Sequence, residues 1–277
     1  MKTLYISDLD GTLLAPNGLP SEFTEKTVNS LVEKGMMISV STSRSVNDAK
    51  DIFSRLHFRT PVITMNGAFI NDFSQKDNAV YHSSIDKSVI PDVIKAFESN
   101  GCCPNMYTFA DGDISIQYRR TLTDIQFDFV NGRRRNFKAV TQVGDFDRSG
   151  DVVFFSCIGD EESTAYAASE LSRIKEINCT RYIDIYYPDS WYVEVSASGA
   201  NKATALRRLI KMTGCDRVVV FGDNHNDLPM FELADEAIAV GNARESVKSA
   251  ASRVILPNSE DGVAKYLLFE YEKYCKA

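Results

Sequence analysis

Two aspartates, Asp8 and Asp10, follow a short apolar strand predicted at residues 4–6 and are separated by one residue. Alternation along an extended chain directs both carboxylates to the same side and turns Leu9 away. Two negative charges held this close repel each other, so the pair requires a cation, a shared proton or a catalytic task. Taken alone, the pair is more typical of an acidic turn at the end of a strand.

A second acidic cluster runs from Asp223 to Asp227 and follows an apolar strand predicted at residues 217–221. In an open parallel sheet the carboxyl ends of the strands face one crevice, which would place Asp8, Asp223 and a backbone carbonyl around one cation. Carboxylate and carbonyl oxygens favour Mg²⁺ over Zn²⁺. Asp227, taken alone, is also an ordinary cap for the helix expected from residue 228.

Polar residues at two further positions extend this pattern. Ser41-Thr42-Ser43-Arg44 follows the strand predicted at residues 36–40, and hydroxyls and amide groups at a helix entrance are typical of an anion site. The same residue types are ordinary helix caps. Lys202 begins the helix predicted at 202–212, where the helix dipole disfavours a cation. A phosphate and two carboxylates facing Lys202 would explain its place.

Strands and helices alternate at both ends of the chain, which predicts a parallel sheet covered on both faces. The segment between them favours helices followed by hairpins, with turns at Asp111-Gly112 and Pro188-Asp189-Ser190. We therefore predict a Rossmann-like, doubly wound α/β core formed by residues 1–82 and 197–277. Residues 83–196 are predicted to form an inserted α+β cap domain with an antiparallel sheet.

The composition narrows the function classes. The 277 residues carry a net charge of -7, which argues against a surface that wraps nucleic acid. No apolar run is long enough to span a bilayer, and no signal peptide is visible. The six cysteines form no Cys-x-x-Cys pair and fit a reducing compartment. We expect a cytoplasmic protein that binds neither nucleic acid nor membranes, and the sequence leaves its oligomeric state open.

Taken together, Asp8-Leu9-Asp10-Gly11-Thr12-Leu13-Leu14, Ser41-Thr42-Ser43-Arg44, Lys202 and Gly222-Asp223-Asn224-His225-Asn226-Asp227 resemble the four ordered motifs of the haloacid dehalogenase-like phosphatases. The long insertion between the second and third motifs resembles the cap of the Cof-type sugar-phosphate phosphatase branch. Asn66-Gly67, Gly241-Asn242-Ala243 and residues 258–262 are also similar to that branch. Ser43 and Ala203 depart from it, because glycine is more frequent at both positions.

The resemblance implies a role for each matching residue. Asp8 would be the nucleophile that becomes an aspartyl phosphate, and Asp10 would protonate the leaving oxygen and then deprotonate water. Mg²⁺ would be held by Asp8, the main-chain carbonyl of Asp10 and Asp223, with Asp227 orienting Lys202 or the metal shell. We expect Asp10 to be buried beside Asp8. The residues implied to bind the phosphate or the rest of the substrate are Leu9, Thr42, Ser43, Arg44, Asn66, Lys202 and Asn226.

The sequence thus predicts a Mg²⁺-dependent phosphatase of small phosphorylated metabolites, with sugar phosphates as the expected substrates and the cap closing over the core. A phosphomutase would use the same core and would need a second anion site, for which Arg119-Arg120 and Arg133-Arg134-Arg135 are candidates. A catalytically silent ligand-binding regulator is the third alternative, and the complete acidic set argues against it. No feature of the sequence names the sugar.

Overall fold

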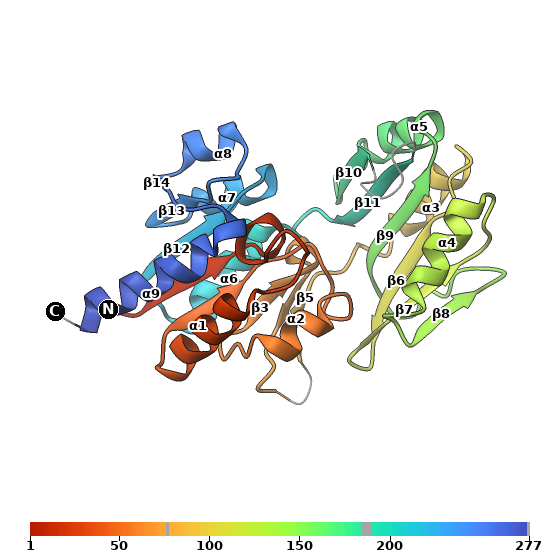
Figure 1. Cartoon of the computed structure of the whole chain (residues 1–277). Helices are drawn as coiled ribbons and strands as arrows, with labels where there is room; N and C mark the ends of the chain where they lie inside the picture. Colours follow the sequence, from red (N-terminus) through yellow and green to blue (C-terminus); the bar gives the residue numbers. More distant parts are fainter. Residues whose placement is uncertain (76–77, 184–189, 276–277) are drawn as a thin grey trace. The chain divides into compact units, whose positions relative to one another are not determined.

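The computed structural model describes residues 1–75, 78–183 and 190–275. The chain divides into two compact units, Met1–Tyr81 with Asn201–Ala277, and His82–Ala200. Figure 1 shows the chain leaving the first unit after β5 (Ala79–His82) and returning to it before α6 (Lys202–Thr213). The second unit is therefore inserted into the first. The turn predicted at Pro188-Asp189 and the last part of the strand predicted at 181–187 lie outside the described residues.

A five-stranded sheet forms the centre of the first unit, in the order β14-β13-β12-β1-β2. Its strands are β1 (Thr3–Ser7), β2 (Met37–Val40), β12 (Arg217–Gly222), β13 (Glu236–Ala239) and β14 (Arg253–Val254). All the pairings are parallel, and Ser7 lies opposite Phe221 on one side and Val40 on the other. Residues that follow β1, β2 and β12 therefore emerge at one edge of the sheet. This sheet confirms the predicted α/β fold.

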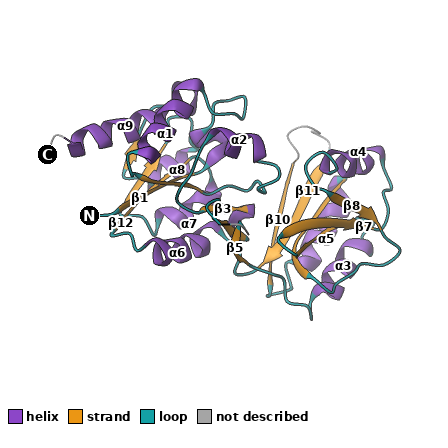
Figure 2. Cartoon of the chain, turned by 90° about the horizontal axis from the view of Figure 1, so that it is seen from below, coloured by secondary structure: helices purple, strands orange, loops and turns teal. Residues whose placement is uncertain are grey.

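Helices cover both faces of this sheet, and for that reason its strands are apolar runs rather than alternating ones. The helices are α1 (Glu22–Glu33), α2 (Lys50–Arg55), α6, α7 (Leu228–Phe231), α8 (Glu245–Ala250) and α9 (Gly262–Cys275). Figure 2 shows α1 and α9 on one face and α6 on the other. Ser21 caps α1 as its sequence indicates, since the Ser21 hydroxyl accepts a hydrogen bond from the Thr24 N–H at 3.0 Å.

Two features of the first unit differ from the sequence expectation. β3 (Val62–Thr64) joins β4 (Phe69–Asn71) and β5 in a separate three-stranded sheet, linked to the parallel sheet by a single bridge between Ser41 and Ile63. The helix expected from residue 45 begins only at Lys50. Ser45 instead accepts from the Asp48 N–H and donates to its carboxylate, closing a local turn that competes with the helix.

The inserted unit contains a six-stranded sheet in the order β10-β11-β9-β6-β7-β8. Its elements are α3 (Ile90–Glu98), β6 (Asn105–Ala110), β7 (Asp113–Tyr118), α4 (Asp124–Arg133), β8 (Ala139–Gln142), β9 (Asp151–Gly159), α5 (Glu161–Leu171), β10 (Ile177–Ile183) and β11 (Trp191–Ala197). The Asp111-Gly112 hairpin is present, and both residues have positive φ. The predicted antiparallel sheet is wrong at one pair, because α4 crosses between β7 and β8 and makes them parallel.

No helix in the described parts of the chain is both long and apolar enough to cross a membrane.

Candidate active site

Asp8 is the first residue beyond β1, and its backbone N–H donates to the carbonyl of Phe221 in β12 at 3.0 Å. A wide turn follows, in which the N–H groups of Leu13 and Leu14 donate to the carbonyls of Asp8 and Leu9. The Asp8 residue is only 7% exposed. The end of the strand and the turn together fix a mostly buried carboxylate at the edge of the parallel sheet.

Gly11 allows this turn to lie directly against the second acidic cluster. Its φ is +79°, and a Cβ atom at this position would lie 2.6 Å from a carboxylate oxygen of Asp223. Only glycine meets both conditions without displacing Asp223. The next residue, Thr12, donates its hydroxyl to Asp223 Oδ1 at 2.9 Å. The turns after β1 and β12 are therefore connected by a direct side-chain contact.

Lys202 lies between two carboxylates. Its Nζ donates to Asp8 Oδ1 at 2.6 Å and to Asp227 Oδ1 at 2.8 Å, and the residue is 2% exposed. Asn201 caps α6 by accepting from the Thr204 N–H at 2.8 Å, which sets where the helix begins. The unfavourable position of a cation at a helix N-terminus is thus offset by two buried carboxylates.

Asp227 uses both of its oxygens within the protein. Oδ1 accepts from Lys202, and Oδ2 accepts from the backbone N–H groups of Asp223 and Asn224 at 3.1 Å each. Asp8, Asp223 and Asp227 bring ligand oxygens within 4.8 Å of one another, a group able to hold a metal ion. Asp8 and Asp223 each keep one oxygen that bonds to no described residue, whereas Asp227 positions Lys202 and its own loop.

The charges of this cluster favour binding of a cation. Burial raises the pKa of Asp8 to about 7; Lys202 opposes this rise, and the nearby Asp227 and Asp223 carboxylates add to it. Burial also raises the pKa of Asp223. Burial alone would lower the pKa of Lys202, but its two carboxylate partners hold that pKa above the ordinary value. Three carboxylates therefore share one ammonium group, and oxygen donors with excess negative charge suit a hard divalent cation.

Asp10 does not have the buried position that the sequence led us to expect. Its side chain is 45% exposed, and its two oxygens accept hydrogen bonds from Arg44 Nη2 at 2.6 Å and Arg44 Nε at 2.8 Å. This two-pronged contact is the geometry that a planar guanidinium favours with a carboxylate. Arg44 therefore contacts Asp10 directly, a contact that the sequence did not predict.

The other residues predicted to bind phosphate differ in their burial and in the groups that they expose to a ligand. Thr42 is buried, and its hydroxyl accepts from the Arg44 N–H at 3.1 Å. Ser43 is exposed. The side chain of Leu9 is packed in the core, so only its backbone is open to a ligand. Because α2 begins at Lys50, Thr42 and Ser43 lie in a turn and not at a helix entrance.

Asn66 and Asn226 lie near each other, with Asn226 Nδ2 at 3.4 Å from Asn66 Oδ1. Met65, Asn66 and Gly67 are consecutive residues with positive φ, a conformation that costs energy for the first two. A Cβ atom at Gly67 would lie 2.3 Å from the Asn201 carbonyl. This strained turn therefore packs against the start of α6 and carries Asn66 to Asn226.

Two asparagines that hold the Asp8 turn were noted in the sequence only as family resemblances. Asn242 Nδ2 donates to the Gly11 carbonyl at 2.7 Å, and Asn258 Nδ2 donates to the Leu14 carbonyl at 2.8 Å. The Asn258 N–H also donates to Asn242 Oδ1 at 2.9 Å. Asn258 is buried at the start of a short 3-10 helix. A buried amide side chain needs hydrogen-bond partners, and Asn258 finds one in the Asp8 turn.

The haloacid dehalogenase-like hydrolase family model matches residues 5–267. Phosphatase YwpJ of Bacillus subtilis is 31% identical over 293 residues, which cover 97% of this chain and 100% of that protein. The 5-amino-6-(5-phospho-D-ribitylamino)uracil phosphatase YitU of the same bacterium is 29% identical over 269 residues, or 95% of this chain and 96% of that one. The crystal structure of a haloacid dehalogenase-like hydrolase from Bacteroides thetaiotaomicron superposes with a TM-score of 0.79 at 26% identity, covering 96% and 98% of the two chains.

These matches span nearly the whole chain, and the chain belongs to the haloacid dehalogenase-like hydrolase family. Within it, the parallel core with an inserted mixed sheet is that of the Cof-type phosphatases, as predicted. The protein is a phosphoric monoester hydrolase.

Binding of a divalent cation by the acidic group is expected to depend on pH through Asp8, and Mg²⁺ serves as the probe. Between the ordinary pKa of an aspartate and about 7, the folded chain holds a proton on Asp8 that the unfolded chain has released. This group's contribution to stability therefore falls as the pH rises through that window. Protons compete with metal for the carboxylate, so Mg²⁺ should raise the melting temperature more at about pH 8 than at about pH 5.5. Asp8→Asn should remove this difference, and equal shifts at both pH values in the wild type would contradict the assignment.

Asn242→Ala is expected to lower kcat by about fivefold, because the Gly11 carbonyl loses a hydrogen bond worth about 1 kcal/mol and the Asp8 turn loosens. Steady-state phosphate release measures the change. The matched control is Asn100→Ala, which removes two side-chain hydrogen bonds from the inserted unit. If the two variants lose the same activity, Asn242 has no special role in the Asp8 turn.

Proposed function

We propose that this chain hydrolyses sugar phosphates and related polyol phosphates with Mg²⁺, through a phosphoryl group transferred to Asp8. The observation that carries the proposal is the buried ammonium of Lys202, 2.6 Å from the carboxylate of Asp8, with Asp223 alongside. A carboxylate that must attack an anionic phosphate needs such a positive partner. Two unit charges of the same sign about 4 Å apart repel by about 4 kcal/mol at an effective dielectric of about 20.

The first step would join an oxygen of Asp8 to phosphorus as the bond from phosphorus to the alcohol oxygen breaks. Lys202, Thr42 and Asn226 would contact the phosphoryl oxygens, where charge builds up during transfer. Ser43, Arg44, Asn66 and the backbone of Leu9 would bind the substrate nearby. The covalent intermediate divides hydrolysis into two easier steps.

Asp10 would give a proton to the departing alcohol oxygen and then take one from the water that attacks the phosphorylated Asp8. The second step releases inorganic phosphate and restores the Asp8 carboxylate. Both oxygens of Asp10 accept from Arg44 in the structure. Each oxygen keeps a second lone pair, through which Asp10 would exchange a proton with the substrate.

Asp8, the Asp10 main-chain carbonyl and Asp223 would hold Mg²⁺, which supplies positive charge to the transferring phosphoryl group. Asp227 would support this arrangement through Lys202, since both of its oxygens are already used. We also propose that residues 1–82 and 197–277 perform the chemistry, and that the insert at 83–196 contributes to the choice of substrate.

The substrate class rests on a likeness to YitU, whose name specifies a phosphate carried on a ribityl chain. A ribityl chain is a polyol, and its phosphate shares with sugar phosphates a hydroxylated leaving group. This shared chemistry supports polyol and sugar phosphates as the first compounds to test.

Phosphate release from a panel of sugar and polyol phosphates is expected with Mg²⁺ and not with excess EDTA. Asp8→Asn keeps the shape of the side chain but removes the nucleophile, and turnover should fall by about a thousandfold or more. Thermal melting of the variant provides the folding control. Wild-type turnover in Asp8→Asn would rule out the covalent mechanism.

Asp10→Asn is expected to slow sugar phosphates far more than p-nitrophenyl phosphate, because p-nitrophenolate leaves without needing a proton. The comparison uses the single-turnover rate constant for release of the alcohol from one sugar phosphate and from p-nitrophenyl phosphate, which reports on the first step. An equal loss with both substrates would mean that Asp10 does not act as the acid.

A further inference from the structure

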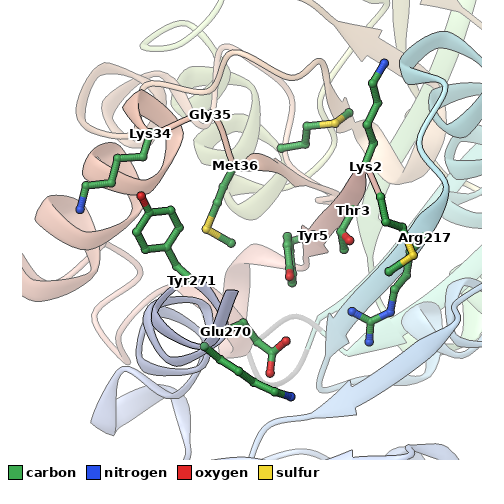
Figure 3. Close-up of a pocket in the computed structure, with 12 residues that line it drawn as sticks. Lys2, Thr3, Tyr5, Lys34, Gly35, Met36, Arg217, Glu270 and Tyr271 are labelled. Atoms are coloured by element: carbon green, nitrogen blue, oxygen red, sulfur yellow. The ribbon is translucent and has the colours of Figure 1, made fainter. Parts of the chain in front are cut away.

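The base of the parallel sheet carries a pocket of about 470 Å³ at the end of β1 away from Asp8. Figure 3 shows Tyr5, Met36, Glu270 and Tyr271 around this hollow, with Lys2, Lys34 and Arg217 at its margins. Tyr5 precedes Asp8 by three residues, a separation of about 10 Å along a strand. The volume lies within the range of small-molecule sites, so the pocket is large enough for a ligand of its own.

The body of the pocket is made of side chains that accommodate flat apolar rings. Tyr5 and Tyr271 supply aromatic surface, and Met36 and Met37 supply flexible thioethers that make favourable contacts with aromatic edges. The pocket belongs entirely to the first unit, between the starts of β1, β2 and β12, the end of α1 and the helix α9. Rigid elements thus form most of its wall.

The Tyr5 hydroxyl is one of the polar groups that line the pocket, together with those of Thr3 and Glu270. Tyr5 is 9% exposed in the middle of β1, between Leu4 and Ile6, and its hydroxyl bonds to no described residue. The hydroxyl is not one of the fully enclosed polar atoms, so it can be reached from the pocket and can form a hydrogen bond with a ligand oxygen. Burial and the nearby Glu270 raise the pKa of Tyr5, which leaves the hydroxyl protonated and able to donate.

The charges around the pocket are mainly positive, although the whole chain has a net charge of -7. Among the described residues that line it, Lys2, Lys34, Lys273 and Arg217 are cationic and Glu270 is anionic. Arg217 forms an ion pair with Glu236, and Lys34 lies 5.0 Å from the centre of the Tyr271 ring. Lys2 and Lys273 form no salt bridge with the described residues, so their charges remain available to an anion.

We propose that this pocket is a second ligand site, which binds a small anion carried on a flat apolar ring, such as an aromatic carboxylate, sulfonate or phosphate. The ring would lie against Tyr5, Met36 and Tyr271, and the anionic group would face the lysines. The site is separate from the acidic cluster at Asp8, and its occupancy does not depend on the phosphatase mechanism.

The test is calorimetric titration of the whole chain with 8-anilinonaphthalene-1-sulfonate, an aromatic sulfonate, in the presence of Mg²⁺ and inorganic phosphate. One probe molecule per chain is expected to bind. Met36→Trp fills the pocket and should weaken binding by about tenfold or more, and Lys34→Glu should weaken it by a similar factor. The matched control is Lys211→Glu, which reverses an exposed charge on α6, away from the pocket.

Melting temperature and phosphate release, measured on each variant, show whether the fold and the Asp8 site are intact. Weaker probe binding in Met36→Trp and Lys34→Glu with unchanged phosphate release supports the proposal. Equal binding in the wild type and both pocket variants, or an equal loss in Lys211→Glu, would overturn it. Absence of phosphatase activity in the wild type would contradict the proposed function. The titration would still support or overturn the pocket proposal, because probe binding does not depend on activity.

Discussion

The contact of Lys202 with Asp8 and Asp227 is the interaction on which the rest of the site depends. It joins the end of β1, the start of α6 and the loop after β12 at one buried nitrogen atom. Burying charges is costly, and removing one member of such a group leaves an uncompensated charge, at a cost of about 3–5 kcal/mol. The cluster therefore fixes the geometry at the edge of the parallel sheet that carries Asp8, and burying its charges lowers the free energy of unfolding.

The backbone around this contact has little freedom to change. Gly11 lies against Asp223, and Gly67 lies against the first turn of α6, so two turns reach the buried charges without a side chain of their own. Asn242 and Asn258 hold the carbonyls on either side of the Asp8 turn. The Asp8 carboxylate is thus positioned by contacts from segments distant in the sequence. Such positioning suits the proposed nucleophile, because small displacements of a reacting group lower the rate.

The meeting of Asp8 and Asp223 could be predicted because both follow strands of one parallel sheet. Lys202 begins a helix, and its place beside them was implied by the family resemblance. Apolar strands followed by acidic residues indicate a parallel sheet, and parallel strands end at one edge. The Arg44–Asp10 contact could not be predicted in this way, since it depends on the direction of two side chains within irregular turns. The late start of α2 arises because the Ser45–Asp48 turn competes with the helix. The parallel pairing of β8 arises because α4 connects it to β7. Neither feature produces a periodic pattern of apolar residues in the sequence.

The pairing of β1 with β12 also constrains how the chain is made. Thr3 lies beside Arg217 and Ser7 beside Phe221, so the first strand emerges from the ribosome some 210 residues before its neighbour, at roughly 5–20 residues per second. The contiguous insert ends at Ala200, before the synthesis of β12 begins at Arg217. The edge of β1 that pairs with β12 therefore stays unpaired during synthesis of the insert. Such long-range pairing slows folding, so the edge of the parallel sheet at Asp8 and Asp223 forms late.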